Sequence, residues 1–153
     1  MKIEYVNNGK FIIYLNKLYY TFDKSTIESC LSKIIKKLKK LYNIEIYSIF
    51  NVECYINDNY GSILVIEREY NPLNLYSKKT DLNIRFYYNS LFLYQIDDYF
   101  LKDKLNDVSI YMNNNKIYID IKDNNIIIIL EHIKNILFKD DVLKILNNSV
   151  KIK

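Results

Sequence analysis

The sequence predicts an α+β protein with helices packed on mainly antiparallel sheet: strand–helix–strand–strand in its first half, hairpin–helix in its second. Apolar and polar residues alternate over several short segments, which is the period of a half-buried strand. Two longer segments repeat apolar residues every three or four positions, which is the period of an amphipathic helix. Half of the 153 residues are apolar and 26% are charged, which is typical of a folded globular chain.

The first half is predicted to contain two extended segments, a helix and two strands, at residues 2–6, 10–20, 25–42, 46–56 and 62–70. Asn7, Asn8 and Gly9 form the first turn, because Asn-Gly supplies the positive φ values that a tight hairpin needs. Ser25 and Glu28 form a capping-box pattern at the start of the helix. The apolar residues of this helix share one sector of its surface, and its lysines occupy the other.

The second half is predicted to contain a strand, a short helix, a hairpin and a last helix, at residues 82–88, 94–105, 108–122 and 124–137, with an ambiguous tail at 142–153. Asp123 or Asn124 is the expected cap of the last helix. The only proline, Pro72, lies between the halves in a segment without periodicity. We therefore expect an N-terminal half at 1–70, a linker at 71–81 and a C-terminal half at 82–153, with a single domain as the alternative.

The composition is strongly biased toward residues with A/T-rich codons. Isoleucine (26), asparagine (20), lysine (20) and tyrosine (16) make up 82 of the 153 residues, and alanine is absent. This bias indicates a very A/T-rich genome. Basic runs and tyrosine clusters arise in such a chain without selection, so each candidate site must be weighed against composition alone.

The excess positive charge belongs to one predicted element. The net charge of the chain is +4, and segment 23–43 accounts for all of it with six lysines against Asp23 and Glu28. Four of these lysines form the candidate nucleic-acid surface: Lys33, Lys36, Lys37 and Lys40. A solvated helix face is the ordinary alternative, since the rest of the chain is charge-neutral and has only two arginines.

Tyrosines provide the candidate protein-binding surface, because tyrosine buries a large area at a small entropy cost. The members chosen are Tyr19, Tyr20, Tyr87, Tyr111 and Tyr118. We expect the most exposed tyrosines to include Tyr19, Tyr20, Tyr55, Tyr60, Tyr87 and Tyr118. The ordinary alternative is that these tyrosines are strand residues whose hydroxyl edge contacts solvent.

Familiar catalytic and metal-binding patterns are not found in the sequence. His132 is the single histidine, and Gly9 and Gly61 alone cannot form a phosphate-binding loop. Cys30 and Cys54 lie far apart, each on the apolar side of its element, and lack the close spacing of zinc ligands. We therefore expect a non-enzymatic protein without a metal or other cofactor; an enzyme with an unfamiliar site is a third possibility.

A cytoplasmic location is expected from the apolar segments. Glu4, Asn7 and Asn8 interrupt any signal-peptide core near the N-terminus. The longest apolar run, Ile126–Leu130, has five residues, whereas a bilayer span needs about 20. We expect no membrane partner, and the sequence makes no prediction of oligomeric state.

The order of elements resembles that of MecA-type adaptor proteins. Residues Lys10–Leu15, the 25–42 helix and the next two strands are similar to the N-terminal part of that family, and Ile96-Asp97-Asp98-Tyr99 looks like its acidic-aromatic helix. The segment Ile110–Ile119 resembles its tyrosine-rich hairpin. This resemblance implies a non-enzymatic adaptor that delivers clients to a Clp-type ATPase. A small protein–protein interaction module is thus the leading predicted function, and nucleic-acid binding is the alternative.

Overall fold

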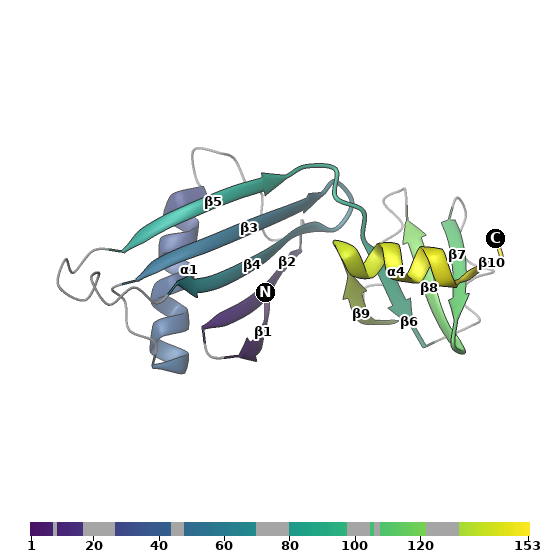
Figure 1. Cartoon of the computed structure of the whole chain (residues 1–153), viewed down its shortest axis with the longest axis horizontal. Helices are drawn as coiled ribbons and strands as arrows, with labels where there is room; N and C mark the ends of the chain where they lie inside the picture. The colour runs from purple at the N-terminus through teal and green to yellow at the C-terminus, as the bar shows by residue number, and fades with distance from the viewer. Residues whose placement is uncertain are drawn as a thin grey trace. The chain divides into compact units, whose positions relative to one another are not determined.

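The computed structural model describes residues 1–7, 9–16, 27–43, 48–69, 80–97, 105, 108–121 and 132–153. These residues form two helices and ten strands in two mostly antiparallel sheets, which confirms the α+β class (Figure 1). The chain divides into two compact units. Unit 1 comprises Met1–Ile56 and Gly61–Tyr87, and unit 2 comprises Asn57–Tyr60 and Tyr88–Lys153.

Unit 1 contains one helix and a five-stranded sheet with the strand order β1-β2-β4-β3-β5. The elements are β1 (Lys2–Asn7), β2 (Lys10–Asn16), α1 (Ile27–Tyr42), β3 (Ile49–Asn57), β4 (Gly61–Glu69) and β5 (Asp81–Tyr87). The first hairpin is confirmed: β1 and β2 pair antiparallel, and Gly9 between them has a φ of 104°. A side chain at Gly9 would be strained, because its Cβ would lie 3.1 Å from the Cβ of Arg68.

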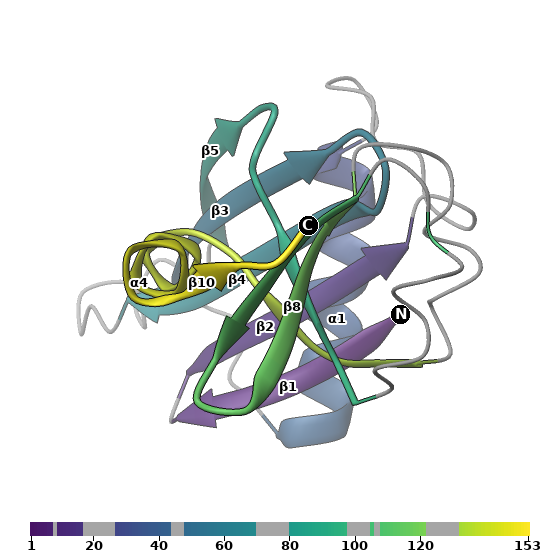
Figure 2. The ribbon, with the colours of Figure 1, turned by 90° about the vertical axis from the view of Figure 1, so that its right-hand side faces the viewer.

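The core of unit 1 lies between α1 and one face of this sheet (Figures 1 and 2). Leu31 and Leu38 of α1 are buried against residues that alternate along the strands, such as Phe11, Val52 and Leu64. The helical and strand periodicities of the sequence therefore predict many inward residues of this unit, but Leu41 and Tyr42, on the expected apolar stripe of the helix, are 58% and 40% exposed. Ser25, the expected capping residue of α1, lies outside the described residues.

Strand β5 differs from its expected place. It matches the predicted 82–88 segment, but it does not open the C-terminal half; it pairs in parallel with β3, from Ile49–Asp81 to Tyr55–Tyr87. Alternation of apolar residues specifies which face of a strand is buried, but not which neighbour it pairs with. The expected linker at 71–81 lies outside the described residues except for Thr80 and Asp81.

Unit 2 contains a second five-stranded sheet with the order β10-β7-β8-β6-β9, in which every pairing is antiparallel. Its elements are β6 (Leu93–Ile96), β7 (Val108–Asn113), β8 (Lys116–Ile121), β9 (Ile133–Leu137), α4 (Asp140–Asn148) and β10 (Val150–Lys151). The predicted hairpin is confirmed as β7 and β8, which cross the middle of Figure 2. Its turn residues Asn114 and Asn115 have φ values of 47° and 60°, as asparagine tolerates.

Two helix predictions in the second half are wrong where the structure describes them. Residues 133–137, assigned to the last helix, form strand β9, and residues 94–96, assigned to a short helix, belong to strand β6. A short apolar run is compatible with a strand or a helix, so pairing with neighbouring strands determines which of the two forms. The tail contains the helix α4 instead, with the three-and-four spacing of Val142, Ile145 and Leu146. Residues 98–104 and 124–131 of the two predicted helices lie outside the described residues.

The turn Asn57–Tyr60 belongs to unit 2 although it connects two strands of unit 1. The Asn57 side chain accepts hydrogen bonds from the backbone N–H groups of Asn59 and Tyr60, both at 2.9 Å, and donates one to the Ser90 carbonyl at 3.0 Å. The Asn59 amide donates to the Ile121 carbonyl at 2.8 Å. Asparagine therefore both shapes this turn and ties it to unit 2.

The face of the second sheet that bears Ile117, Ile119 and Ile121 is buried, and aromatic rings contribute to it. Tyr60 packs against Phe92 and Tyr94, with centroid distances of 6.0 and 6.1 Å. The Tyr94 hydroxyl is buried and has no hydrogen-bond partner among the described residues. Burial raises the pKa of Tyr94 far above its usual range, with smaller contributions from Tyr60 and Asp120, so this phenol stays neutral.

Candidate functional site

Four predicted lysines lie together on the solvent side of α1, and we call them the lysine stripe: Lys33, Lys36, Lys37 and Lys40. All four are exposed, whereas Leu31, Ile34, Ile35 and Leu38 of the same helix are buried against the sheet. Their spacing of three and four residues places them on one side of the helix, over an axial length of about 10 Å. The structure thus brings this candidate set together as the sequence predicts.

The lysine stripe has no countercharge within the described residues. None of its four ammonium groups makes an ion pair or hydrogen bond there, and Glu28 is the only carboxylate on α1. Other lysines do have acidic partners: Lys2 with Glu4, Lys10 with Glu67, Lys134 with Asp97 and Lys144 with Asp141, at 2.9 to 3.8 Å. Like charges three or four residues apart repel each other, so the stripe destabilises the helix that displays it.

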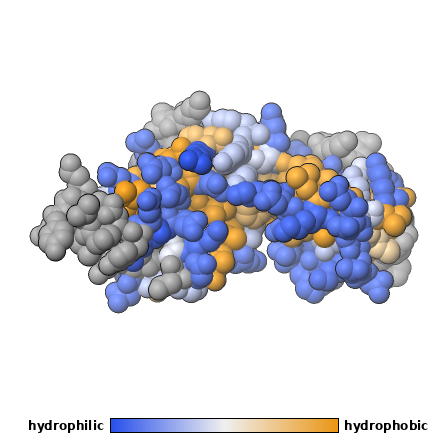
Figure 3. All heavy atoms as spheres, viewed as in Figure 1, coloured by the Kyte–Doolittle hydropathy of each residue, from blue (hydrophilic) through white to orange (hydrophobic). Residues whose placement is uncertain are grey.

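The face of the unit 1 sheet that points away from α1 carries carboxylates, and two of these accept hydrogen bonds from tyrosines. Glu53 accepts a hydrogen bond of 2.7 Å from the Tyr55 hydroxyl, and Glu4 accepts one of 2.9 Å from Tyr14. Hydrophobic and hydrophilic residues alternate over the side of unit 1 that Figure 3 shows. Among the described residues of unit 1, the lysines without an ion pair therefore lie on its helix side.

Of the predicted protein-binding tyrosines, Tyr111 and Tyr118 are register partners on the β7–β8 hairpin of unit 2, whereas Tyr87 belongs to unit 1. Tyr87 is 39% exposed on β5 and stacks on Tyr55 of β3, with ring centroids 4.8 Å apart. Tyr111 is half-buried in unit 2, and Tyr118, expected at the surface, is only 5% exposed. The prediction of exposure is wrong for Tyr118 because α4 covers this side of the hairpin. It is also wrong for Tyr55 and Tyr60, which are buried; Tyr19 and Tyr20 lie outside the described residues.

A different aromatic group lies at the end of α1, and we call it the aromatic end: the exposed Tyr5 and Tyr42 with the buried Phe11 that both contact. Tyr5 and Tyr42 stack with centroids 5.6 Å apart, and both contact Phe11 at 5.3 to 5.4 Å. Tyr5 and Tyr42 remain 51% and 40% exposed, and Leu41 beside them is 58% exposed. Sequence analysis missed this group, because it joins a strand to the last turn of a helix far along the chain.

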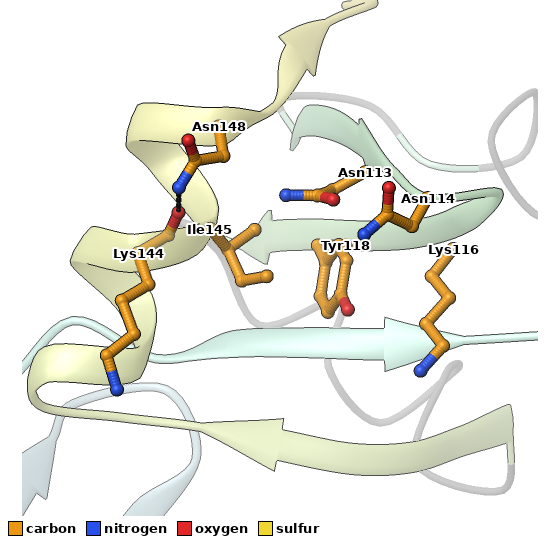
Figure 4. A pocket seen from close by; sticks show the side chains of 7 residues that line it. All are labelled: Asn113, Asn114, Lys116, Tyr118, Lys144, Ile145 and Asn148. Atoms are coloured by element: carbon orange, nitrogen blue, oxygen red, sulfur yellow. Dashed lines mark hydrogen bonds between the residues drawn. The ribbon is translucent and has the colours of Figure 1, made fainter.

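Unit 2 contains a polar pocket of about 450 Å³ between the β7–β8 turn and α4 (Figure 4). Its lining combines asparagine amides and lysines with one phenol and one aliphatic side chain: Asn113, Asn114, Asn148, Lys116, Lys144, Tyr118 and Ile145. The α4 side of unit 2 is largely hydrophilic in Figure 3. The sequence does not predict the pocket, because residues 142–153 have no assigned element there, although the spacing of Val142, Ile145 and Leu146 is a usable signal for a helix.

The residues considered for catalysis or metal binding are dispersed. His132 is exposed and directly precedes β9. Burial raises the pKa of the Cys54 thiol to about 12, and burial raises that of Cys30 with Lys33 opposing it. Within the described ranges, no three His, Cys, Asp or Glu side chains are grouped to hold a metal ion. Both thiols are therefore protonated and weakly reactive at neutral pH.

No protein family, curated protein or solved structure was found to match the chain. Neither of the helices in the described part of the chain is long and apolar enough to cross a bilayer. Functional inference therefore depends on the surfaces and the pocket described above.

Proposed function

We propose that this protein binds nucleic acid through the lysine stripe of α1. One observation supports this most directly: four exposed ammonium groups lie on one side of a helix without a countercharge among the described residues. Nucleic acid supplies such a countercharge as a regular array of phosphates. Composition bias explains why lysines are frequent in the chain, but it does not explain why four of them lie on one side of α1 without an ion pair among the described residues.

The geometry suits backbone contact without sequence readout. A stripe of about 10 Å spans about three phosphate steps of one strand, whose phosphates are about 3.4 Å apart along the duplex axis. Lysine is a point charge on a long side chain, so it positions a protein on phosphates but reads no base edges by itself. We therefore expect similar affinity for unrelated sequences of equal length.

The test is the salt dependence of binding to a fluorescently labelled 20-base-pair duplex, measured by anisotropy. Four phosphate contacts predict a log–log slope of affinity against salt of about −3 to −4, which is about a 100-fold loss between 50 and 200 mM KCl. Changing Lys33, Lys36, Lys37 and Lys40 together to Gln should reduce the slope to about −1 or less and weaken binding on the order of 100-fold.

A matched control changes four lysines outside the stripe to Gln: Lys2, Lys10, Lys134 and Lys151. This variant loses the same net charge, so a general charge effect would weaken both proteins equally. The proposal requires that the control keep the steep slope. Equal losses in the two variants, or no binding by the wild-type protein at 50 mM KCl, would contradict it.

The aromatic end supports a second candidate, the protein–protein interaction module predicted from the sequence. Exposed stacked tyrosines beside an exposed leucine are typical of protein-binding surfaces. The adaptor function implied by the MecA-type resemblance stays a prediction. It requires that the protein co-purify with a Clp-type hexameric ATPase and stimulate its ATP hydrolysis, and that changing Tyr5 and Tyr42 to Ser reduce both. Recovery of no ATPase would count against the adaptor, and unchanged capture by the double variant would count against the aromatic end.

A further inference from the structure

The polar pocket of unit 2 contains four side chains that have no partner in the described part of the chain. Within the described residues, Asn113, Asn114, Lys116 and Tyr118 make no side-chain hydrogen bond or ion pair. All four come from the β7–β8 hairpin and face the same hollow, with α4 on its other side (Figure 4). Three different kinds of hydrogen-bonding group therefore converge on a space of about 450 Å³, a size typical of small-molecule sites.

Tyr118 provides the strongest indication of a ligand. Its side chain is packed under α4 with Leu93 and Val142, and the residue is only 5% exposed. Its hydroxyl has no partner among the described residues, and Tyr118 is one of the residues that line the pocket. The hydroxyl is not among the fully buried polar atoms, so a bound molecule can reach it and exchange a hydrogen bond with it. Burial also raises the pKa of Tyr118, which keeps the phenol a donor at neutral pH.

The backbone fixes the two asparagines of the turn. Asn114 and Asn115 both have positive φ, and Asn113 and Lys116 close the hairpin as a register pair. On the other wall, Asn148 donates to the Lys144 carbonyl at 2.8 Å, which orients its amide. The lining groups are thus held by regular structure, which lowers the ordering cost of binding.

The charge of the lining favours an anion. Lys116 is unpaired within the described residues, and no carboxylate is among the lining side chains. Lys144 is partly neutralised by Asp141 at 3.0 Å, so about one net positive charge faces the ligand. Lysine binds a tetrahedral phosphoryl group as a point charge, whereas planar carboxylates are matched best by the arginine fork, which is missing from this lining.

The asparagines indicate the rest of the ligand. Each carboxamide has both a donor and an acceptor, which is the pairing that a sugar hydroxyl needs. We propose that this pocket binds a phosphorylated sugar, with Lys116 and the Tyr118 hydroxyl on the phosphoryl group and Asn113, Asn114 and Asn148 on the sugar hydroxyls. This proposal is independent of the lysine stripe, whose residues belong to unit 1.

The test uses ribose 5-phosphate as the probe, followed by amide chemical shifts of the full chain. Ribose 5-phosphate should shift amides of the β7–β8 turn and of α4, and it should bind at least about tenfold more tightly than inorganic phosphate, ribose or citrate. Tyr118→Phe should weaken binding about tenfold, because it removes one hydrogen bond to a charged group.

Tyr111→Phe is the matched control, since Tyr111 is the register partner of Tyr118 but does not line the pocket. It should bind the probe like the wild-type protein, as should the variant with four Gln residues in the lysine stripe. No shift at about 10 mM probe would overturn the proposal. Equal binding of inorganic phosphate or citrate would overturn the sugar-phosphate assignment, and equal affinities of the two phenylalanine variants would overturn the role of Tyr118. If Tyr118→Phe loses its dispersed spectrum, Lys116→Gln replaces it in the same comparison.

Discussion

Leu31→Ala is expected to lower the free energy of unfolding of unit 1 by about 2 to 5 kcal/mol. Leu31 is fully buried on α1, within the core cluster that also contains Phe11 and Leu64. The substitution removes three side-chain carbons and leaves a cavity in a close-packed core, so both lost transfer free energy and lost contacts contribute. Urea unfolding monitored by circular dichroism measures the effect.

Leu41→Ala on the same helix is the matched control. The chemistry of the change is identical, but Leu41 is 58% exposed, so we expect a change below about 0.5 kcal/mol. Because the lysine stripe remains on α1 in both variants, folded protein should keep its steep salt dependence. Equal stabilities for the two alanine variants would contradict the packing of α1 described above.

Asn57→Ala is expected to destabilise unit 2 by about 3 kcal/mol. The Asn57 side chain makes three hydrogen bonds, to the amides of Asn59 and Tyr60 and to the carbonyl of Ser90. Each is worth about 1 kcal/mol, and the part-buried groups left behind lose their partners. Faster hydrogen exchange of the Asn59 and Tyr60 amides would locate the effect.

Asn147→Ala tests whether any asparagine change of this kind is destabilising. Asn147 is exposed on α4 and makes no hydrogen bond with its side chain in the described part of the chain. Alanine has the higher helix propensity, so stability should be unchanged or slightly raised. If Asn57→Ala were equally neutral, the turn would not depend on the three hydrogen bonds seen in the structure.

Local sequence patterns predicted local structure well and distant partners poorly. The lysines of α1 were found because a period of 3.6 residues places them on one side of a single helix. The aromatic end was missed because Tyr5 and Tyr42 meet only after the sheet has formed. Tyr118 is predicted to be exposed because it lies on the strand face opposite that of Ile117 and Ile119. The alternation does not show that α4 covers the face that bears Tyr118.

The same limit explains the errors in the second half. Residues 133–137 have apolar spacing that suits a helix, but pairing with β6 satisfies their backbone as a strand. The strand that pairs with β5 could not be predicted from local patterns either, since its parallel pairing with β3 joins segments about 30 residues apart. Pairing of this kind depends on the whole sheet and is not encoded in either segment alone.

The turn Asn57–Tyr60 prevents the two units from being separated by a single cut in the chain. Neither unit is one continuous stretch of sequence, because four residues of unit 2 are encoded between two strands of unit 1. A fragment beginning at Tyr88 would lack the Tyr60 ring that packs on Phe92 and Tyr94, and the Ser90 and Ile121 carbonyls would lose their asparagine donors. A fragment ending at Tyr87 would present that ring without its aromatic neighbours. Cutting the polypeptide between the units therefore separates residues that fold together.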